Sequence, residues 1–313
     1  MTTEPTSASL DLSRPKSIHV VGIGGAGMSA IAMVLSTMGH TVTGSDLKDS
    51  SVTERLRAAG ITVAVGHDAA NVGPVDLVTR SSAVSDRNPE VAEAVRRGIP
   101  VYRRAEALAA IAALRRCIAV AGTHGKTTTA SMLALMLVEA GMRPSFIIGG
   151  EVNEIGTNAV WDDGDWLVVE ADESDGTFLS LDPAIAVVTN VEPDHLDHYG
   201  SFDAMKTAFE EFVAHGSIPP VVGGDDPVAS ALGRARGGQT VGTGPDCTRR
   251  MVDIEPARSS ISFDLLDETG ARLGHLAIPI PGRHNARNAA VATGSTTSKV
   301  AGATMSEVTT SPI

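Results

Sequence analysis

The feature that most constrains the fold is an apolar segment that runs through a glycine-rich turn into a helix, and it occurs twice. Residues 17–21 lead into Gly22-Ile-Gly-Gly-Ala-Gly27, and residues 117–121 lead into Gly122-Thr-His-Gly-Lys-Thr-Thr128. A short, continuous apolar run suits a strand that is buried on both faces. Each copy therefore predicts a strand–loop–helix unit of a parallel α/β sheet.

Strands and helices alternate on both sides of residue 109, and a chain of 313 residues suits two domains. We expect an α/β fold with a Rossmann-like N-terminal domain at 17–108. A P-loop-type α/β ATPase domain with a mostly parallel sheet is expected at 109–293, with a small antiparallel hairpin near its end. Residues 1–16 are expected to be a disordered arm. The stretch 294–313, rich in Ser, Thr and Gly, is expected to be an unstructured tail.

Charge and composition exclude several classes of protein. The net charge of −12 argues against nucleic acid as a partner, since a basic face is the usual footprint of such binding. The sequence has neither a signal peptide nor an apolar run of the roughly 18–20 residues that a membrane span needs. With only two cysteines, a reduced compartment fits. We therefore expect a cytoplasmic protein that does not bind membranes.

The second glycine loop is the strongest local signal of chemistry. Backbone N–H groups at a helix start, together with the helix dipole, attract phosphate. Lys126 would reach the outer phosphates of a nucleotide, and the Thr127 hydroxyl would hold Mg²⁺. The strict P-loop pattern has glycine where this chain has Val120, so the match is to a shortened variant. The alternative is an ordinary strand-to-helix turn.

Two acidic segments follow later strands. Glu170 ends the apolar strand expected at 167–169, and Asp194-His195 comes shortly after the one at 185–188. In open α/β sheets, ligands bind at the carboxyl ends of the strands. Carboxylates there can hold Mg²⁺ against phosphate oxygens, which favours a metal site. A solvated acidic loop and a capped turn are the alternatives for the two segments.

The first glycine loop, with Asp46 at the end of the next strand, fits the dinucleotide fingerprint. Its chemistry requires only a pyrophosphate at a helix start, so NAD and a UDP-sugar both qualify. Two phosphate-type loops in two domains indicate two nucleotide-like ligands. An NAD-dependent oxidoreductase would leave the second loop without a role. Farther on, Asn285 and Asn288 share one helix face and either contact an adenine edge or cap the helix.

Together these segments resemble the Mur ligase family. The matching motifs, in order, are Ile18-His-Val-Val-Gly-Ile-Gly-Gly-Ala-Gly-Met28, Gly44-Ser-Asp46, the loop after Ala119, Glu170-Ala-Asp-Glu-Ser-Asp-Gly176 and Thr189-Asn-Val-Glu-Pro-Asp-His195. The resemblance runs from about Ser17 to Thr293. Gly24 and Ser174 favour the member that adds L-alanine over the one that recycles murein tripeptide, which usually has Cys and Tyr there.

The resemblance implies a role for each matching residue. The catalytic group would be Lys126, Glu170 and His195, and the Mg²⁺ ligands would be Thr127, Glu170 and His195. ATP would be bound by Gly122, Thr123, His124, Gly125, Lys126, Thr127, Thr128, His284, Asn285 and Asn288. The UDP-sugar substrate would be bound by Gly22, Gly24, Gly25, Ala26, Gly27, Met28, Asp46, Ser82, Glu173 and Ser174.

The activity that the resemblance implies is ATP-dependent joining of L-alanine to UDP-N-acetylmuramate in peptidoglycan precursor synthesis. The substrate carboxylate would become an acyl phosphate, which the amine of L-alanine then attacks. Nothing in this sequence matches the third domain of the family, which binds the amino acid. We therefore expect impaired ligation by this chain, and the alternative is a non-catalytic protein that binds UDP-N-acetylmuramate and ATP. Its oligomeric state is not predicted.

Overall fold

The computed structural model describes residues 10–152, 155–174 and 176–296. Most of the predicted arm, residues 1–9, and most of the predicted tail, residues 297–313, lie outside the described residues. In the described part of the arm, Leu12 is buried and the Lys16 N–H donates to His40 Nδ1. The chain divides into two units, Met1–Arg115 with Gly149–Trp161 and Arg116–Ile148 with Asp162–Ile313.

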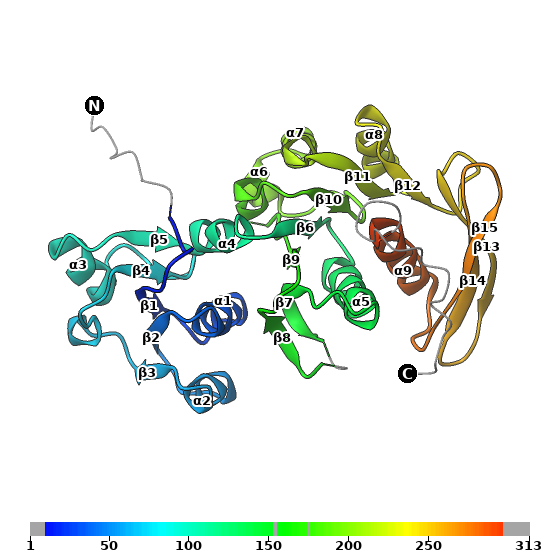
Figure 1. Ribbon diagram of the computed structural model, residues 1–313. Helices are drawn as coiled ribbons and strands as arrows, with labels where there is room; N and C mark the ends of the chain where they lie inside the picture. Colours follow the sequence, from blue (N-terminus) through cyan, green and yellow to red (C-terminus); the bar gives the residue numbers. More distant parts are fainter. Residues whose placement is uncertain (1–9, 153–154, 175, 297–313) are drawn as a thin grey trace. The chain divides into compact units, whose positions relative to one another are not determined.

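The first unit contains a five-stranded parallel sheet in the order β3-β2-β1-β4-β5, which confirms the Rossmann-like expectation. In Figure 1, α3 lies on the opposite side of this sheet from α1 and α2. The elements are β1 Ser17–Val21, α1 Ala26–Thr37, β2 Thr41–Asp46, α2 Ser51–Ala58, β3 Thr62–Val65, the 3₁₀ turn η1 Ala69–Asn71, β4 Leu77–Arg80, α3 Pro89–Arg96, β5 Val101–Arg103 and α4 Arg104–Ala112.

The register of this sheet places three loops at one edge. Strand β1 is central, and Val21 is aligned with Ser45 of β2 on one side and with Arg80 of β4 on the other. The turn after β1, the end of β2 and the loop after β4 therefore lie together at the carboxyl edge. In β1, Ile18, Val20 and Val21 are buried, and so is the polar His19 between them, as a strand covered on both faces requires.

The second unit is built on a larger sheet, in the order β15-β14-β13-β12-β11-β10-β6-β9-β7-β8. The C-terminal half of β7 and all of β8 are grouped with the first unit. The elements are β6 Arg116–Ala121, α5 Lys126–Glu139, β7 Ser145–Val152, β8 Thr157–Val160, β9 Trp166–Glu170, η2 Thr177–Ser180, β10 Ile185–Val188, α6 Leu196–Tyr199, α7 Phe202–His215, β11 Ile218–Gly223, α8 Pro227–Ala235, β12 Gln239–Gly242, β13 Arg249–Pro256, β14 Ile261–Leu266, β15 Arg272–Ile278 and α9 Arg283–Thr296.

The central strands of this sheet are parallel and covered on both faces. Helices α7 and α8 lie on one face, and α5 packs beside α9 on the other (Figure 1). Strand β6 is aligned with β9 and β10, so that Val120 pairs with Glu170 and Ala121 with Val188. The loops that follow these three strands therefore meet at one edge. This is the mostly parallel sheet that the sequence predicts.

Three details differ from the expectations. The predicted domain boundary at residue 108 falls inside α4, which belongs to the first unit as a whole. The predicted hairpin is a three-stranded meander, because β13, β14 and β15 pair antiparallel in sequence. Helix α9 continues to Thr296, three residues into the predicted tail, and these residues are buried.

The last turns of α9 show how Ser and Thr can be buried in a helix. The Thr293 hydroxyl donates to the Ala289 carbonyl, and the Ser295 hydroxyl donates to the Val291 carbonyl. Each polar group is satisfied by the backbone of its own helix, so burial leaves no orphaned donor. Within the described ranges, no helix is long and apolar enough to cross a membrane.

Candidate functional site

The loop between β6 and α5 has a backbone that requires glycine at both of its glycine positions. Gly122 has a φ of +131° and Gly125 a φ of +83°, a region that L side chains rarely adopt. Space is also lacking, because a Cβ on Gly122 would lie 2.1 Å from Thr189 Oγ1. One on Gly125 would lie 2.6 Å from Asn288 Oδ1. The sequence pattern therefore has a steric cause at each glycine.

The segment after β10 holds this loop in place. The Asn190 carbonyl accepts from the Thr123 N–H at 3.0 Å, and the Asn190 side chain exchanges hydrogen bonds with the backbone of His124 in both directions. Thr189 Oγ1 donates to the His124 carbonyl at 2.6 Å. The loop is therefore fixed before any ligand arrives. The sequence analysis did not assign this bracing role to Thr189 and Asn190.

Lys126, the first residue of α5, points back into the loop. Its Nζ donates to the Gly122 carbonyl at 2.8 Å and lies 2.9 and 2.8 Å from the two carboxylate oxygens of Glu173. The Glu173 side chain is 0% exposed and that of Lys126 is 15% exposed. The Glu173 carboxylate thus forms a buried ion pair with the loop lysine, and its predicted role in substrate binding stays a prediction.

Thr127 and Glu170 form the second contact across this edge. Thr127 Oγ1 donates to Glu170 Oε1 at 2.8 Å. A hydroxyl and a carboxylate oxygen are the hard donors that Mg²⁺ prefers, and Mg²⁺ usually keeps waters and takes only one or two protein ligands beside phosphate. These two residues therefore fit a magnesium ion at the start of α5. The register of β6 with β9 brings them together.

His195 is placed differently from the other two proposed metal ligands. It has a left-handed φ of +49° and precedes α6, with its side chain 39% exposed and its Nε2 3.7 Å from Asp194. Among the described residues, no cluster of three or more His, Cys, Asp and Glu side chains could hold a metal by itself. A metal role for His195 stays a prediction.

The two asparagines at the start of α9 do different things. The Asn285 side chain donates to the Pro281 carbonyl at 2.7 Å, which ties down the turn before the helix. Asn288 is buried, and its amide lies against Gly125. The exposed ring of His284 lies beside Gly282. Asn285 thus ties the preceding turn to the helix by donating, whereas a cap would accept a backbone N–H, and Asn288 reaches the phosphate-type loop.

In the first unit, the Gly22–Gly27 loop is tied to the end of β2. The N–H groups of Gly22 and Ile23 both donate to the Ser45 carbonyl at 2.9 Å. The Gly24 N–H donates to Asp46 Oδ2 at 2.8 Å. Asp46, predicted to bind the UDP-sugar, braces the loop in this structure. Ser82 is exposed in the loop after β4, and its neighbour Ser81 lies against Gly22.

A buried polar network lies beneath this loop around Glu90, which is 0% exposed. Ser45 Oγ donates to Glu90 Oε2 at 2.5 Å, and Asn71 Nδ2 donates to Oε1 at 2.6 Å. His19 Nε2 lies 3.4 Å from Oε2. Burial by itself raises the pKa of Glu90, but hydrogen bonds from His19, Ser45 and Asn71 outweigh it and lower the pKa to about 2. The carboxylate is therefore ionised and anchors Ser45.

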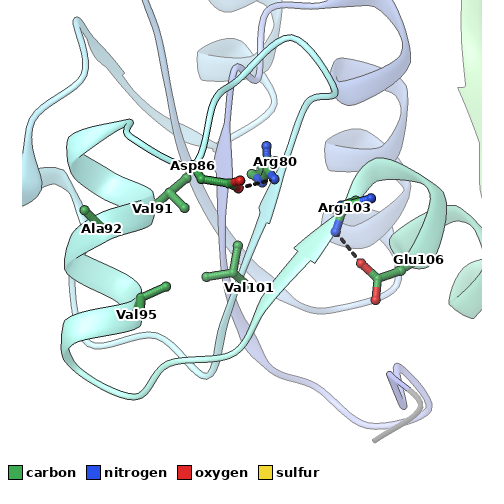
Figure 2. A pocket seen from close by; sticks show the side chains of 8 residues that line it. All are labelled: Arg80, Asp86, Val91, Ala92, Val95, Val101, Arg103 and Glu106. Carbon is green, nitrogen blue, oxygen red and sulfur yellow. Dashed lines mark hydrogen bonds and ion pairs between the residues drawn. The ribbon is translucent and has the colours of Figure 1, made fainter. Parts of the chain in front are cut away.

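Two pockets in the described part of the chain are lined by none of the predicted site residues. The larger, of about 560 Å³, lies over α3 and β5 of the first unit, where the Arg80–Asp86 ion pair borders apolar side chains (Figure 2). Its lining residues are Arg80, Asp86, Val91, Ala92, Val95, Val101, Arg103 and Glu106. The other, of about 310 Å³, lies between β13 and the start of α9. We assign the ligand sites from the loops instead, because the convergent polar groups are there.

The structure therefore brings the predicted residues together as two separate sets. Lys126, Thr127, Glu170 and Asn288 surround the Gly122–Thr128 loop in the second unit. The glycines at 22–27, Ala26, Met28, Asp46 and Ser82 lie at the sheet edge of the first unit. Glu173 and Ser174, predicted to bind the same substrate as the latter set, belong to the second unit.

Comparison with known families gives a match for each part of the chain. Residues 17–116 match the model described as "Mur ligase family, catalytic domain", and residues 120–296 match the "Mur ligase middle domain". Among curated proteins, UDP-N-acetylmuramate–L-alanine ligase from Bradyrhizobium sp. (strain BTAi1) is 49% identical over 287 residues, and that from Xanthobacter autotrophicus is 46% identical over 288. Both alignments cover 88% of this chain and 61% of the relative.

Solved structures give the same result. UDP-N-acetylmuramate-alanine ligase MurC from Thermotoga maritima matches with a TM-score of 0.81 and 32% identity, over 90% of this chain and 64% of that one. UDP-N-acetylmuramate:L-alanyl-γ-D-glutamyl-meso-diaminopimelate ligase (MPL) from Neisseria meningitides matches with a TM-score of 0.78 and 29% identity, over 90% of this chain and 93% of that one. The chain thus spans about three fifths of the length of the curated relatives that it matches.

Proposed function

This chain belongs to the Mur ligase family, and on that premise we propose that it serves the ATP-dependent joining of L-alanine to UDP-N-acetylmuramate. The observation that carries the proposal is the convergence of Lys126, Thr127 and Glu170 on one fixed loop. The identity of 46–49% to ligases of that name supports the choice of substrates. The reaction would draw on ATP in the cytoplasm, as a step of peptidoglycan precursor synthesis.

In this proposal, the second unit binds ATP and the first binds the UDP part of the sugar nucleotide. The Lys126 ammonium has three N–H groups, of which Gly122 and Glu173 accept two, so that the third is left for an outer phosphate. Thr127 and Glu170 would hold Mg²⁺, which neutralises phosphate charge when bound. A role for His195 at a second metal position is part of the proposal.

The chemistry follows from what these groups position. A carboxylate oxygen of UDP-N-acetylmuramate attacks the γ-phosphorus of ATP and ADP leaves, which gives an acyl phosphate. The amine of L-alanine then attacks the acyl carbon, phosphate leaves, and the amine loses a proton. Phosphoryl transfer of this kind depends mostly on positioning and on charge neutralisation. Lys126 supplies the protein's own positive charge at that point.

The test is ADP release by the purified chain, measured with UDP-N-acetylmuramate and L-alanine together and with each one omitted. Release that needs both substrates supports the ligase, and Thr127→Val should reduce it. Calorimetric titration with ATP, UDP-N-acetylmuramate and NAD separates the alternatives. Binding of the first two without turnover would favour the non-catalytic binding protein. Binding of NAD but not of UDP-N-acetylmuramate would overturn the proposal.

A further inference from the structure

The Gly22–Gly27 loop and the start of α1 contain no positively charged residue. Gly25 is the N-cap of α1, its cap has no side-chain hydrogen bond, and the first turn has no acidic residue. The loop N–H groups before it are already used by Ser45 and Asp46. By contrast, the ATP loop of the second unit carries its own cation, Lys126. A diphosphate at α1 would gain from a full positive charge nearby, since the helix dipole and the N–H groups supply only partial charge.

Arg104 supplies a cation at this place from another element. It is the first residue of α4 and follows β5, whose register with β4 aligns Arg103 with Arg80 at the same carboxyl edge. A Cβ built on Gly27 would lie 2.5 Å from Arg104 Nη1 and 3.5 Å from its Cδ. The guanidinium therefore lies over Gly27, in the first turn of α1, and occupies the space that any larger residue at 27 would take.

We infer that Arg104 binds the diphosphate of the sugar nucleotide, an inference that rests on the proposed function. A guanidinium is planar, permanently charged and suited to pairing with two phosphate oxygens at once. It has five N–H donors, so it can keep a protein contact and still bind phosphate. This contact also explains why residue 27 is a glycine, because the missing side chain leaves room for the Arg104 guanidinium beside the start of α1.

The test is calorimetric titration of UDP into the full chain and into Arg104→Gln. Loss of a charge-assisted hydrogen bond predicts affinity for UDP that is roughly 10- to 100-fold weaker. Arg104→Lys, which keeps the charge but loses the paired geometry, should lie in between. The matched control is Arg103→Gln, the same change one residue earlier, at the α3–β5 pocket (Figure 2). This variant should alter the affinity for UDP less than about twofold.

Gly27→Ala provides a second route that leaves Arg104 in the chain. The new Cβ displaces the guanidinium, a flexible group that can move, so the fold is kept while UDP binding weakens. In the Arg104→Gln background, the same change should have little further effect. A further large loss there would mean that the Cβ obstructs UDP itself, and would count against the inference. The affinity for Mg-ATP should stay unchanged in all of these variants. This measurement serves as the control that the second unit is still folded.

The outcomes separate this inference from the proposed function. If the unaltered chain binds UDP and Arg104→Gln binds it equally well, the role of Arg104 is refuted and the proposed function stands. If the unaltered chain binds neither UDP nor UDP-N-acetylmuramate, the proposed function itself fails. A loss confined to Arg104→Gln and Gly27→Ala, with Arg103→Gln unaffected, establishes the contact.

Discussion

Replacing Lys126 should unfold the second unit more readily, in addition to any effect on ATP. The Glu173 carboxylate is 0% exposed, and both of its oxygens lie within 2.9 Å of Lys126 Nζ. No other partner is recorded for its Oε2 within the described residues. Lys126→Met would therefore leave a buried carboxylate without its counter-charge, which costs about 3–5 kcal/mol.

That magnitude is large beside a typical total stability of about 5–15 kcal/mol. For a unit of this size it corresponds to a fall in Tm of roughly 6–20 °C. The assay is thermal and urea unfolding of the nucleotide-free chain, followed by circular dichroism. The destabilisation comes from a buried carboxylate that has lost its counter-charge. The double variant Lys126→Met with Glu173→Met should therefore recover most of the lost stability, because replacing both partners of a buried ion pair by apolar groups is nearly neutral.

Glu173→Met alone is the matched single variant. It leaves Lys126, which is 15% exposed and can still reach water, so it should cost less than Lys126→Met. The reasoning is refuted if Lys126→Met melts at the temperature of the unaltered chain. It is equally refuted if the double variant loses as much as the two single variants together. If the prediction holds, ATP affinities of Lys126 variants must be measured well below their lowered Tm.

Three further predictions concern the Gly122–Thr128 loop and the buried network around Glu90. Gly122→Ala should abolish ATP binding in a nucleotide titration, because its Cβ would meet Thr189 Oγ1 at 2.1 Å; unchanged affinity would contradict the fixed loop. Thr127→Val should weaken ATP binding with Mg²⁺ present and leave it unchanged in EDTA, since the hydroxyl and Glu170 would hold the metal; equal losses in both media would argue against a metal role. The Glu90 pKa of about 2, lowered from 4.5, contributes stability on the order of 3 kcal/mol that is complete above pH 4.5 and disappears as the pH falls to 2. Urea unfolding across this range should show the loss and Glu90→Gln should lack it, whereas parallel curves would contradict the assignment.

Much of the ligand chemistry could be predicted from local sequence. Lys126 and Thr127 follow directly from the glycine loop, because a helix start creates a phosphate site wherever a strand leads into it. Glu170 was predicted from its place at the end of an apolar strand, and the aligned register of β6 and β9 puts it beside Thr127. The family and its fold class were predicted from ordered motifs and are confirmed by the matches.

The structural roles of other residues could not be predicted from local sequence patterns. Glu173 lies in an acidic stretch that equally predicts a solvated loop, and only packing against α5 makes its carboxylate the buried partner of Lys126. Arg104 begins a helix 77 positions after Gly27, and no spacing rule links them. The Ser/Thr-rich end of α9 predicted disorder, yet it is a buried part of the helix, where Gly294 lies against Val221 of β11 and Val241 of β12.

Local patterns were enough to predict the two strand–loop–helix units, the phosphate-type loops and the family, because backbone geometry and the helix dipole act over a few consecutive residues. The partners of the charged side chains became known from the fold: Lys126 with Glu173, Arg104 over Gly27, and Glu90 beneath Ser45. The physical reason is that a charge's partner is set by distance and burial. Sheet register and helix packing bring together residues that are 45 or more positions apart in the chain.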